Sequence, residues 1–159
     1  MLKIEYTVTD QRDLDLIGHL WEKLNEHHRV RSPHWAGYYA RMTFDLRKKE
    51  LLEKSSNGTM RIDIAKDGNT GVLVGYCVST VSEKKGGEIE SIFVEKDYRM
   101  HGIGDDFMKK ALAWMDSLSV ADTDRVIGVA AGNEDAFTFY SKHNFYPRVT
   151  RLRSGPSMG

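Results

Sequence analysis

The sequence predicts one α/β domain built around a mixed β-sheet. A short apolar strand from Glu88, a glycine-containing turn and an amphipathic helix ending near Leu118 are followed by a second apolar strand. That pattern is typical of a crossover between two parallel strands. Ahead of the crossover, three strand-like segments joined by short turns predict an antiparallel meander. The expected order is strand, two helices, three strands, helix, strand, helix and strand.

The N-terminal part predicts a strand and two helices. Residues Leu2–Val8 alternate as a strand, and Thr9 or Asp10 can cap the helix that follows. We expect that helix to end near His27 and His28; its inner stripe is formed by Leu14, Ile17, Leu20, Trp21 and Leu24. Ser32-Pro33 predicts the start of the second helix, with proline at its first position. The inner face of this helix would hold Tyr38, Tyr39, Met42 and Leu46, with a break before Glu50 and an end at Ser55–Gly58.

The remaining elements follow from alternation, turn residues and helical spacing. Residues 60–66, 72–82 and the segment from Glu88 predict the meander, with turns at 67–71 and 83–87. Apolar residues Phe107, Met108, Ala111, Leu112, Met115 and Leu118 line one helix face, and Arg125–Ala131 predicts the parallel strand. A short helix at 134–143 would be capped by Asn133, and Tyr146–Leu152 predicts a final strand. We expect a single domain over residues 1–153 and a disordered tail over 154–159.

Composition narrows the class of protein. The chain has 159 residues with 23 basic and 23 acidic side chains, so its formal net charge is zero. This balance does not favour a nucleic-acid or membrane-surface partner, and it leaves self-association into a homodimer unopposed. Neither a signal core nor a membrane-spanning run is recognisable, and the single Cys77 forms no intrachain disulfide, which together predict a cytoplasmic protein.

The junction between the Glu88 strand and its helix predicts an anion site. Gly102 and Gly104 let the backbone turn sharply beside the unpaired N–H groups of a helix start, which suits phosphate. A dinucleotide fingerprint does not fit, because Phe107 stands where its third glycine belongs and no acidic residue closes the next strand. A P-loop does not fit either, because Gly104 precedes two aspartates rather than Lys and Ser or Thr.

Two segments carry a resemblance to a known family. Glu90-Ser-Ile-Phe-Val followed by Tyr98-Arg99-x-x-Gly102-x-Gly104 resembles the acetyl-CoA signature of the GNAT superfamily of N-acyltransferases. Residues 133–145, with Asn133, Ala136, Phe139-Tyr140 and Phe145, are similar to its second motif. Asn144 replaces the usual glycine, a mild departure because asparagine tolerates the left-handed conformation. Met100 and His101 also depart, at positions that would contribute backbone amides.

The resemblance implies a GNAT-type fold, in which two parallel central strands splay apart, and an enzyme that moves an acetyl group from acetyl-CoA to a primary amine. It implies acetyl-CoA contacts from one set of residues: Ile92, Phe93, Val94, Arg99, Met100, His101, Gly102, Ile103, Gly104, Asp105, Asn133 and Tyr140. The backbone of 92–94 would pair with the pantetheine arm. No Ser/Cys–His nucleophile motif is present, so direct attack by the amine is expected.

Glu90 is the candidate general base and Tyr140 the candidate general acid. A carboxylate at Glu90 would be partly desolvated beside Ile89, which raises the pKa of a carboxyl group and improves it as a base near neutral pH. Glu90 also fits a solvent-facing or cross-strand-paired glutamate, with Glu88 or water as the base instead. In family members the tyrosine matching Tyr140 lies beside the CoA sulfur, although a core aromatic is the competing interpretation.

The acceptor amine is not encoded in a recognisable motif. A polar cluster between the first two helices lies where family members often bind the acceptor: His27, His28, Arg29, Arg31, His34 and Trp35. No Cys or carboxylate spacing supports a metal there, so no metal is expected. The expected acceptor is either a small molecule or a peptide amine, and a non-catalytic acyl-CoA-binding module is the alternative to an enzyme.

Overall fold

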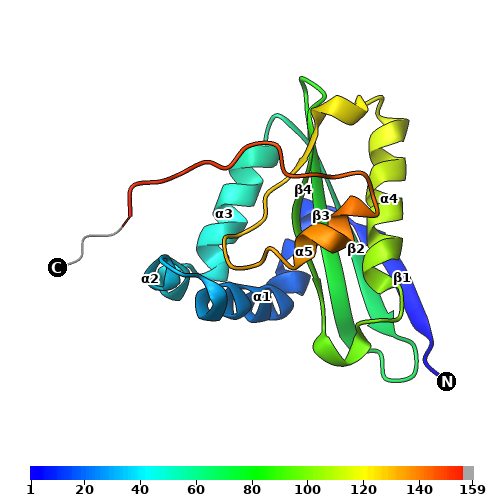
Figure 1. Cartoon of the computed structure of the whole chain (residues 1–159). Coiled ribbons are helices and arrows are strands. Elements are labelled where there is room, and N and C mark those ends of the chain that lie inside the picture. Colours follow the sequence, from blue (N-terminus) through cyan, green and yellow to red (C-terminus); the bar gives the residue numbers. More distant parts are fainter. Residues whose placement is uncertain (156–159) are drawn as a thin grey trace.

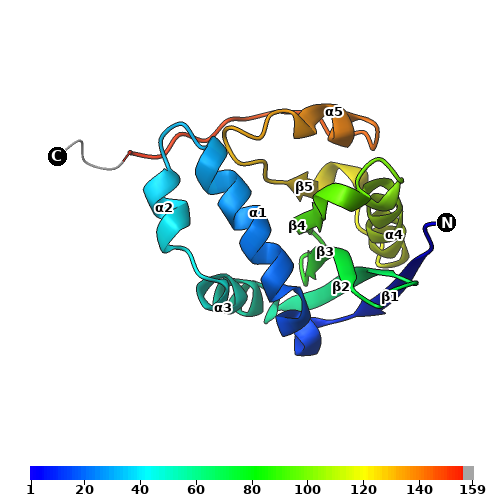
Figure 2. The same cartoon turned by 90° about the horizontal axis from the view of Figure 1, so that it is seen from below.

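The computed structural model describes residues 1–155. Its centre is a five-stranded mixed sheet in the order β1-β2-β3-β4-β5. Helices α1 and α3 cover one face of the sheet and α4 covers the other (Figures 1 and 2). The predicted α/β class and the meander-plus-crossover arrangement are confirmed.

The N-terminal part forms a strand and then a helical layer. Strand β1 (Ile4–Thr9) leads into a 3₁₀ helix, η1 (Gln11–Ile17), whose cap is the Asp10 side chain accepting from the Arg12 N–H. Helix α1 (Gly18–Arg31) continues past the expected end and stops where Ser32 turns extended. Pro33 is not the first helical residue as predicted, because the Trp35 N–H bonds to Ser32 Oγ at 2.9 Å and α2 begins only at Ala36.

The expected second helix is two helices. α2 (Ala36–Arg41) ends at an extended Met42, and α3 (Phe44–Ser55) restarts at Thr43, whose hydroxyl accepts from the Leu46 N–H. The break therefore falls before Phe44 rather than just before Glu50. Leu46 is exposed and only Leu51 of α3 is fully buried, so the predicted continuous inner face does not form.

Three strands make the antiparallel meander: β2 (Gly58–Asp67), β3 (Leu73–Ser82) and β4 (Gly87–Val94). In the β3–β4 pairing Ser79 faces Ile89 and Val78 faces Ser91, so Glu90 is an extra residue in a β-bulge. Each sheet face carries its own apolar core. The α1/α3 side is packed by Leu14, Ile17, Trp21, Leu51, Tyr76 and Phe93, and the α4 side by Val74, Cys77, Ile89, Phe107, Met108 and Met115.

The crossover returns the chain beside β4. Helix α4 (Ile103–Ser117) has the expected buried stripe and leads through a 3₁₀ turn, η3 (Asp122–Asp124), to β5 (Arg125–Ile127), which is parallel to β4. The prediction extended this strand to Ala131, but only three residue pairs form. Helix α5 (Ala136–Ser141) follows, and its N-cap is Asp135 rather than the predicted Asn133.

The predicted final strand, Tyr146–Leu152, does not form within the described chain. Because β5 is only three residues long, it offers a short template, and Pro147 has no N–H to donate to a ladder. The sheet therefore has five strands, and β5 lies at its edge rather than at its centre. The tail prediction falls largely on residues 156–159, which lie outside the described residues. Within residues 1–155, no helix is both long and apolar enough to cross a membrane.

Candidate active site

The candidate active site lies where β4 and β5 part. The two strands pair only from Gly87–Arg125 to Ile89–Ile127, so the β4 backbone from Glu90 to Val94 has no neighbouring strand on that side. A pocket of about 380 Å³ occupies this fork. Its walls come from β4, the segment after β5, α5 and the α1–α2–α3 layer. The geometry gives a cleft with free backbone groups on one wall and side chains of the helical layer on the other.

Glu90 lies in this pocket and is held by three neighbours. Its side chain is only 1% exposed, and its carboxylate accepts a hydrogen bond from Thr80 at 2.6 Å. Lys54 Nζ of α3 lies 2.8 Å from the same oxygen, and Arg47 lies 3.8 Å from the other. Glu90 is thus desolvated as expected, and because both of its oxygens have partners it is an anchored negative charge.

The β-bulge explains how Glu90 reaches these partners. An extra residue leaves one backbone carbonyl out of the ladder. That carbonyl belongs to Glu90, and the Arg47 guanidinium donates to it at 3.1 Å. Arg47 and Lys54 are seven residues apart, two turns of α3, and so they lie on one face of that helix. Sequence reasoning missed both residues, because nothing local in α3 states that this face of the helix meets β4.

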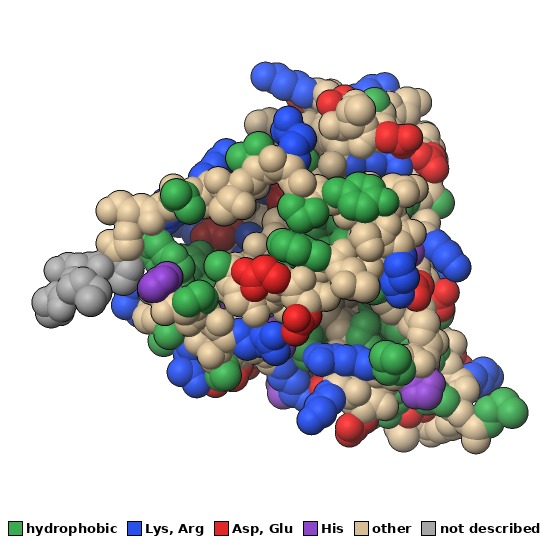
Figure 3. Space-filling view, viewed as in Figure 1, with side chains coloured by type: hydrophobic (Ala, Val, Ile, Leu, Met, Phe, Trp, Pro, Cys, Tyr) green, Lys and Arg blue, Asp and Glu red, His purple; other side chains and the backbone are tan. Residues whose placement is uncertain are grey.

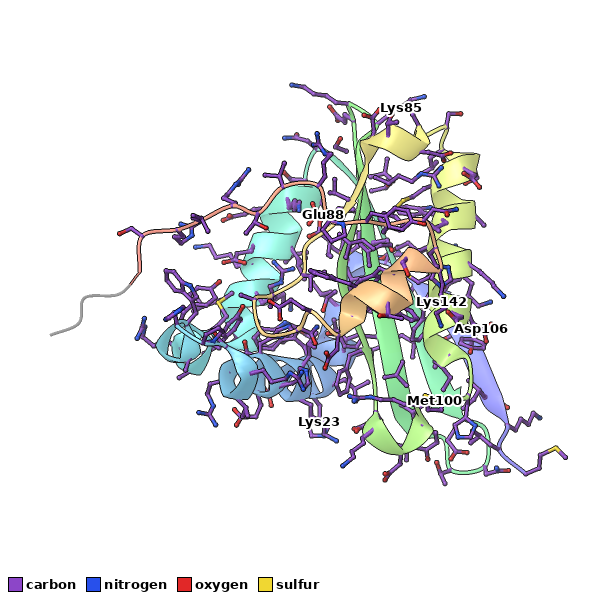
Figure 4. The ribbon with its side chains drawn as sticks, in the orientation of Figure 1. Lys23, Lys85, Glu88, Met100, Asp106 and Lys142 are labelled. Carbon is purple, nitrogen blue, oxygen red and sulfur yellow. The ribbon has the colours of Figure 1, made fainter. Side chains whose placement is uncertain are left out.

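Glu88, the alternative base, is two residues away on β4 and binds the same lysine. Lys54 Nζ lies 2.7 Å from the carboxylate of Glu88, a residue labelled in Figure 4. Burial raises the pKa of Glu88, with Lys54 opposing that effect and Glu90 adding to it. Glu88 is not among the residues that line the pocket. Its carboxyl is therefore easier to protonate than an ordinary glutamate but lies outside the cleft.

Tyr140 and Asn133, which both belong to the second motif, line the pocket. Tyr140 is on α5, and burial raises its pKa to about 12, with a smaller contribution from Cys77, so its phenol keeps its proton at neutral pH. The Asn133 side chain lies 3.3 Å from His27 Nε2 on α1 and does not cap α5. The structure thus brings Glu90, Tyr140 and Asn133 to one cleft, together with the β4 backbone.

Aromatic and imidazole side chains form the opposite wall. Tyr38 and Tyr39 lie edge to face at 5.1 Å, and the His28 ring is 5.4 Å from Tyr39. Burial, reinforced by His27, lowers the pKa of His28 to about 4, and its buried Nδ1 has no hydrogen-bond partner in residues 1–155. Of the polar cluster predicted between the helices, His28 lines the pocket, whereas Arg29, Arg31, His34 and Trp35 do not. No group of three or more metal-ligating side chains occurs in the described chain.

The predicted phosphate loop lies at the other end of β4, outside the pocket. Met100 and Gly102 both have positive φ, 66° and 80°, and Met100 is 99% exposed (Figure 4). These left-handed residues turn the chain so that the first N–H groups of α4, from Ile103 onward, stay unpaired. A Cβ built at Gly102 would meet no atom within 4 Å, so there is room for a ligand beside it. The loop's backbone geometry therefore suits an anion.

Side chains around this loop support the same geometry. Arg99 donates to the Val94 carbonyl at 2.8 Å and lies over the Phe93 ring. Asp105 binds His143 at 2.8 Å, which lowers the pKa of Asp105, so its charge at the helix start is partly compensated. Gly104 also lets α4 pack closely against α5, because a Cβ at this position would lie 3.1 Å from the Phe139 ring. The loop is exposed at His101, and Ile103 is buried in the α4 core.

Comparisons with known proteins agree with this architecture. The family model described as "Acetyltransferase (GNAT) family" matches residues 17–145. A GCN5-related N-acetyltransferase from Ralstonia eutropha is 21% identical with a TM-score of 0.72, over 99% of this chain and 100% of that one. A putative acetyl transferase from Pyrococcus furiosus is 24% identical with a TM-score of 0.67, over 96% and 100%.

An aminoglycoside acetyltransferase from an uncultured soil metagenomic sample, solved in complex with sisomicin, is 15% identical with a TM-score of 0.64 over 97% of both chains. A comparison with curated protein sequences gave no match. The structural similarities establish the fold, and the family model covers most of the chain, including both motifs, the fork between β4 and β5 and the loop before α4. The chain therefore belongs to the GNAT family of acetyltransferases.

Proposed function

We propose that this protein is an acetyl-CoA-dependent N-acetyltransferase acting on a primary amine, with residues 1–153 as one catalytic domain in the cytoplasm. The observation that carries the proposal is the pocket at the fork of β4 and β5, where Tyr140 and unpaired β4 backbone face a wall of helical side chains. One cleft thus offers a place for a thioester and a place for an amine. Solved relatives are named for acetyl transfer to aminoglycosides and to a ribosomal-protein alanine, so the proposed acceptor is a small-molecule or a peptide amine.

The proposed acetyl-CoA position follows β4 to the start of α4. The pyrophosphate would be bound by backbone N–H groups from Met100 to Asp105, which lie beside a helix N-terminus, and the Arg99 guanidinium would add positive charge nearby. The pantetheine arm would pair with the unpartnered backbone of Ile92–Val94, and this places the thioester near Tyr140 and Asn133. A relative solved with CoA, named as an aminoglycoside N-acetyltransferase, has the same fold at a TM-score of 0.58.

The proposed reaction is a direct transfer. The neutral amine nitrogen bonds to the thioester carbonyl carbon, the C–S bond breaks, and the departing thiolate takes the proton of the Tyr140 hydroxyl. The nitrogen, which is positively charged after the attack, releases a proton to solvent to give the neutral amide, and solvent returns a proton to Tyr140. The amine must first lose its own proton. Glu90 provides a negative charge at the pocket wall that attracts the ammonium and receives that proton through water, with Glu88 as the alternative acceptor. The chemistry uses no metal.

One substitution tests the acid role without altering the packing. Tyr140→Phe keeps the ring and removes only the hydroxyl, and general acids contribute about 10²–10⁴-fold to rate. We expect kcat to fall at least about tenfold, with acetyl-CoA affinity and thermal stability unchanged. Tyr146→Phe is the matched control, because that ring is exposed and outside the pocket.

The assay is release of CoA across a panel of primary amines, run beside acceptor-free hydrolysis. Turnover of any amine by the native protein supports the enzyme, and acetyl-CoA binding without turnover across the panel would favour the acyl-CoA-binding module instead. A Tyr140→Phe variant as fast as the native protein, with chemistry rate-limiting, would refute the acid role.

A further inference from the structure

Deprotonation of the acceptor amine leaves a proton inside the pocket. The proposed reaction delivers that proton to Glu90, whose side chain is only 1% exposed. A carboxylate that keeps its proton cannot accept another in the next turnover, so the proton must reach solvent. The acceptor and acetyl-CoA would fill the cleft and exclude water from it during the reaction. The proton therefore needs an exit through the protein.

Lys54 joins Glu90 to a second carboxylate. Lys54 Nζ lies 2.8 and 3.0 Å from the two carboxylate oxygens of Glu90 and 2.7 Å from the carboxylate of Glu88. An ammonium group has three N–H donors, so one lysine can serve both carboxylates at the same time. Glu90 lines the pocket, whereas Lys54 and Glu88 do not. The three groups thus lead from the cleft to a position outside it.

Exposure to solvent increases along these three groups. The side chain of Glu88 is 29% exposed and that of Lys54 is 46% exposed, against 1% for Glu90. Basic side chains reach the surface around the end of α3, the helix that carries Lys54 (Figure 3). The two outer groups can therefore exchange protons with water, which Glu90 cannot reach directly.

The surroundings of the two carboxylates favour a proton on Glu88. Burial raises the pKa of Glu88, and the negative charge of Glu90 adds to this rise while Lys54 opposes it. Thr80 donates to the Glu90 carboxylate at 2.6 Å and Arg47 lies 3.8 Å from it, and both contacts stabilise its ionised form. Glu88 has Lys54 as its one cationic contact among the residues that the structure describes.

We propose that Lys54 and Glu88 form a proton relay that returns Glu90 to its ionised form in each turnover. In one concerted step, Lys54 gives the proton of one N–H bond to Glu88 and takes the proton of the Glu90 carboxyl group. Glu90 is then a carboxylate, Lys54 is again an ammonium, and Glu88 is a carboxylic acid that releases its proton to water. The relay rests on the proposed function, because it needs an acceptor amine that loses a proton to Glu90.

Two substitutions remove the transfer and preserve the charge or the shape of the site. Lys54→Arg keeps a positive charge between the carboxylates, but a guanidinium is not deprotonated in proteins. Glu88→Gln keeps the shape of the side chain and cannot accept the proton. Each should lower kcat at least about tenfold and leave KM for the amine and for acetyl-CoA unchanged. Lys49→Arg and Glu53→Gln, at exposed positions on α3, are the matched controls and should keep the native rate.

Rescue by a small buffer separates a proton relay from a structural role. In Glu88→Gln, Lys54 is still present and exposed, so it can pass the proton to a buffer molecule instead. Increasing imidazole at fixed pH and ionic strength should therefore restore kcat of Glu88→Gln. The same buffer should not restore Lys54→Arg, because nothing then carries the proton away from the buried Glu90. Circular dichroism and urea unfolding check that both variants fold like the native protein.

The outcomes distinguish the relay from the function on which it rests. A native protein that turns over no amine overturns the proposed function and the relay with it. An active native protein with Lys54→Arg or Glu88→Gln at the rate of its control overturns the relay alone. A slow Glu88→Gln variant that imidazole does not restore also overturns the relay, because the role of Glu88 is then structural.

Discussion

Removing the Lys54 ammonium should expose how much of the site depends on its ion pair with Glu90. Lys54→Met keeps most of the side-chain volume and deletes the charge that lies 2.8 Å from a carboxylate only 1% exposed. Breaking a buried pair by removing one partner costs about 3–5 kcal/mol. Lys54 is itself 46% exposed, and Thr80 and Arg47 still contact Glu90, so we expect a loss of about 2 kcal/mol in the free energy of unfolding.

Urea unfolding measures this loss in the free energy of unfolding. The midpoint of thermal unfolding should fall by about 4 to 8 °C for a domain of this size. Lys49→Met is the matched control on α3, because Lys49 is exposed and forms no ion pair within the described residues. Adding Glu90→Gln to Lys54→Met should recover part of the loss, since the unpaired charge is then gone. A Lys54→Met variant as stable as the control, or no recovery in the double variant, would refute the view that Glu90 is an anchored charge.

Two further predictions use matched pairs of variants. Gly102→Ala and Gly71→Ala each place a side chain at a positive φ with open space around it, so the two variants carry similar backbone strain. Only Gly102→Ala should weaken acetyl-CoA binding, by about tenfold in the dissociation constant measured by calorimetry. The depressed pKa of His28, about 4, means that unfolding takes up a proton there, so stability is lost as pH falls from about 6.5 to 4. The free energy of unfolding, measured by urea denaturation between pH 4 and pH 6.5, should change with pH by about 2 kcal/mol less in His28→Gln than in the native protein. The exposed His34→Gln variant should keep the native pH dependence, and the same pH dependence in both variants would contradict the prediction.

Much of the fold was predictable because its elements are locally encoded. The alternation of 60–66, the apolar stripe of α4 and the turn residues at 67–71 each determine structure within a few neighbours. The two family motifs likewise correctly predicted membership of the GNAT family. Tyr140, Asn133 and Glu90 meet in one pocket, although their catalytic and binding roles stay predictions.

What could not be predicted depends on pairing between distant segments. The bulge at Glu90 exists only in the register between β3 and β4, and a single sequence does not state that register. Arg47 and Lys54 act on Glu90 from 36 or more residues away. The break at Met42 was misplaced although Thr43 caps α3, because a threonine inside a helical pattern does not by itself mark a new start. The cap of α5 was misplaced because the Asn133 side chain contacts His27 instead of the helix.

The length of β5 links the site and the open sheet edge. Because β5 stops pairing at Ile127, β4 keeps unpaired backbone from Glu90 onward, and the pocket forms in the gap. Because β5 ends at Ile127, residues Gly128 to Ala130 are irregular chain that lines the pocket wall, and β5 itself is a short strand at the edge of the sheet.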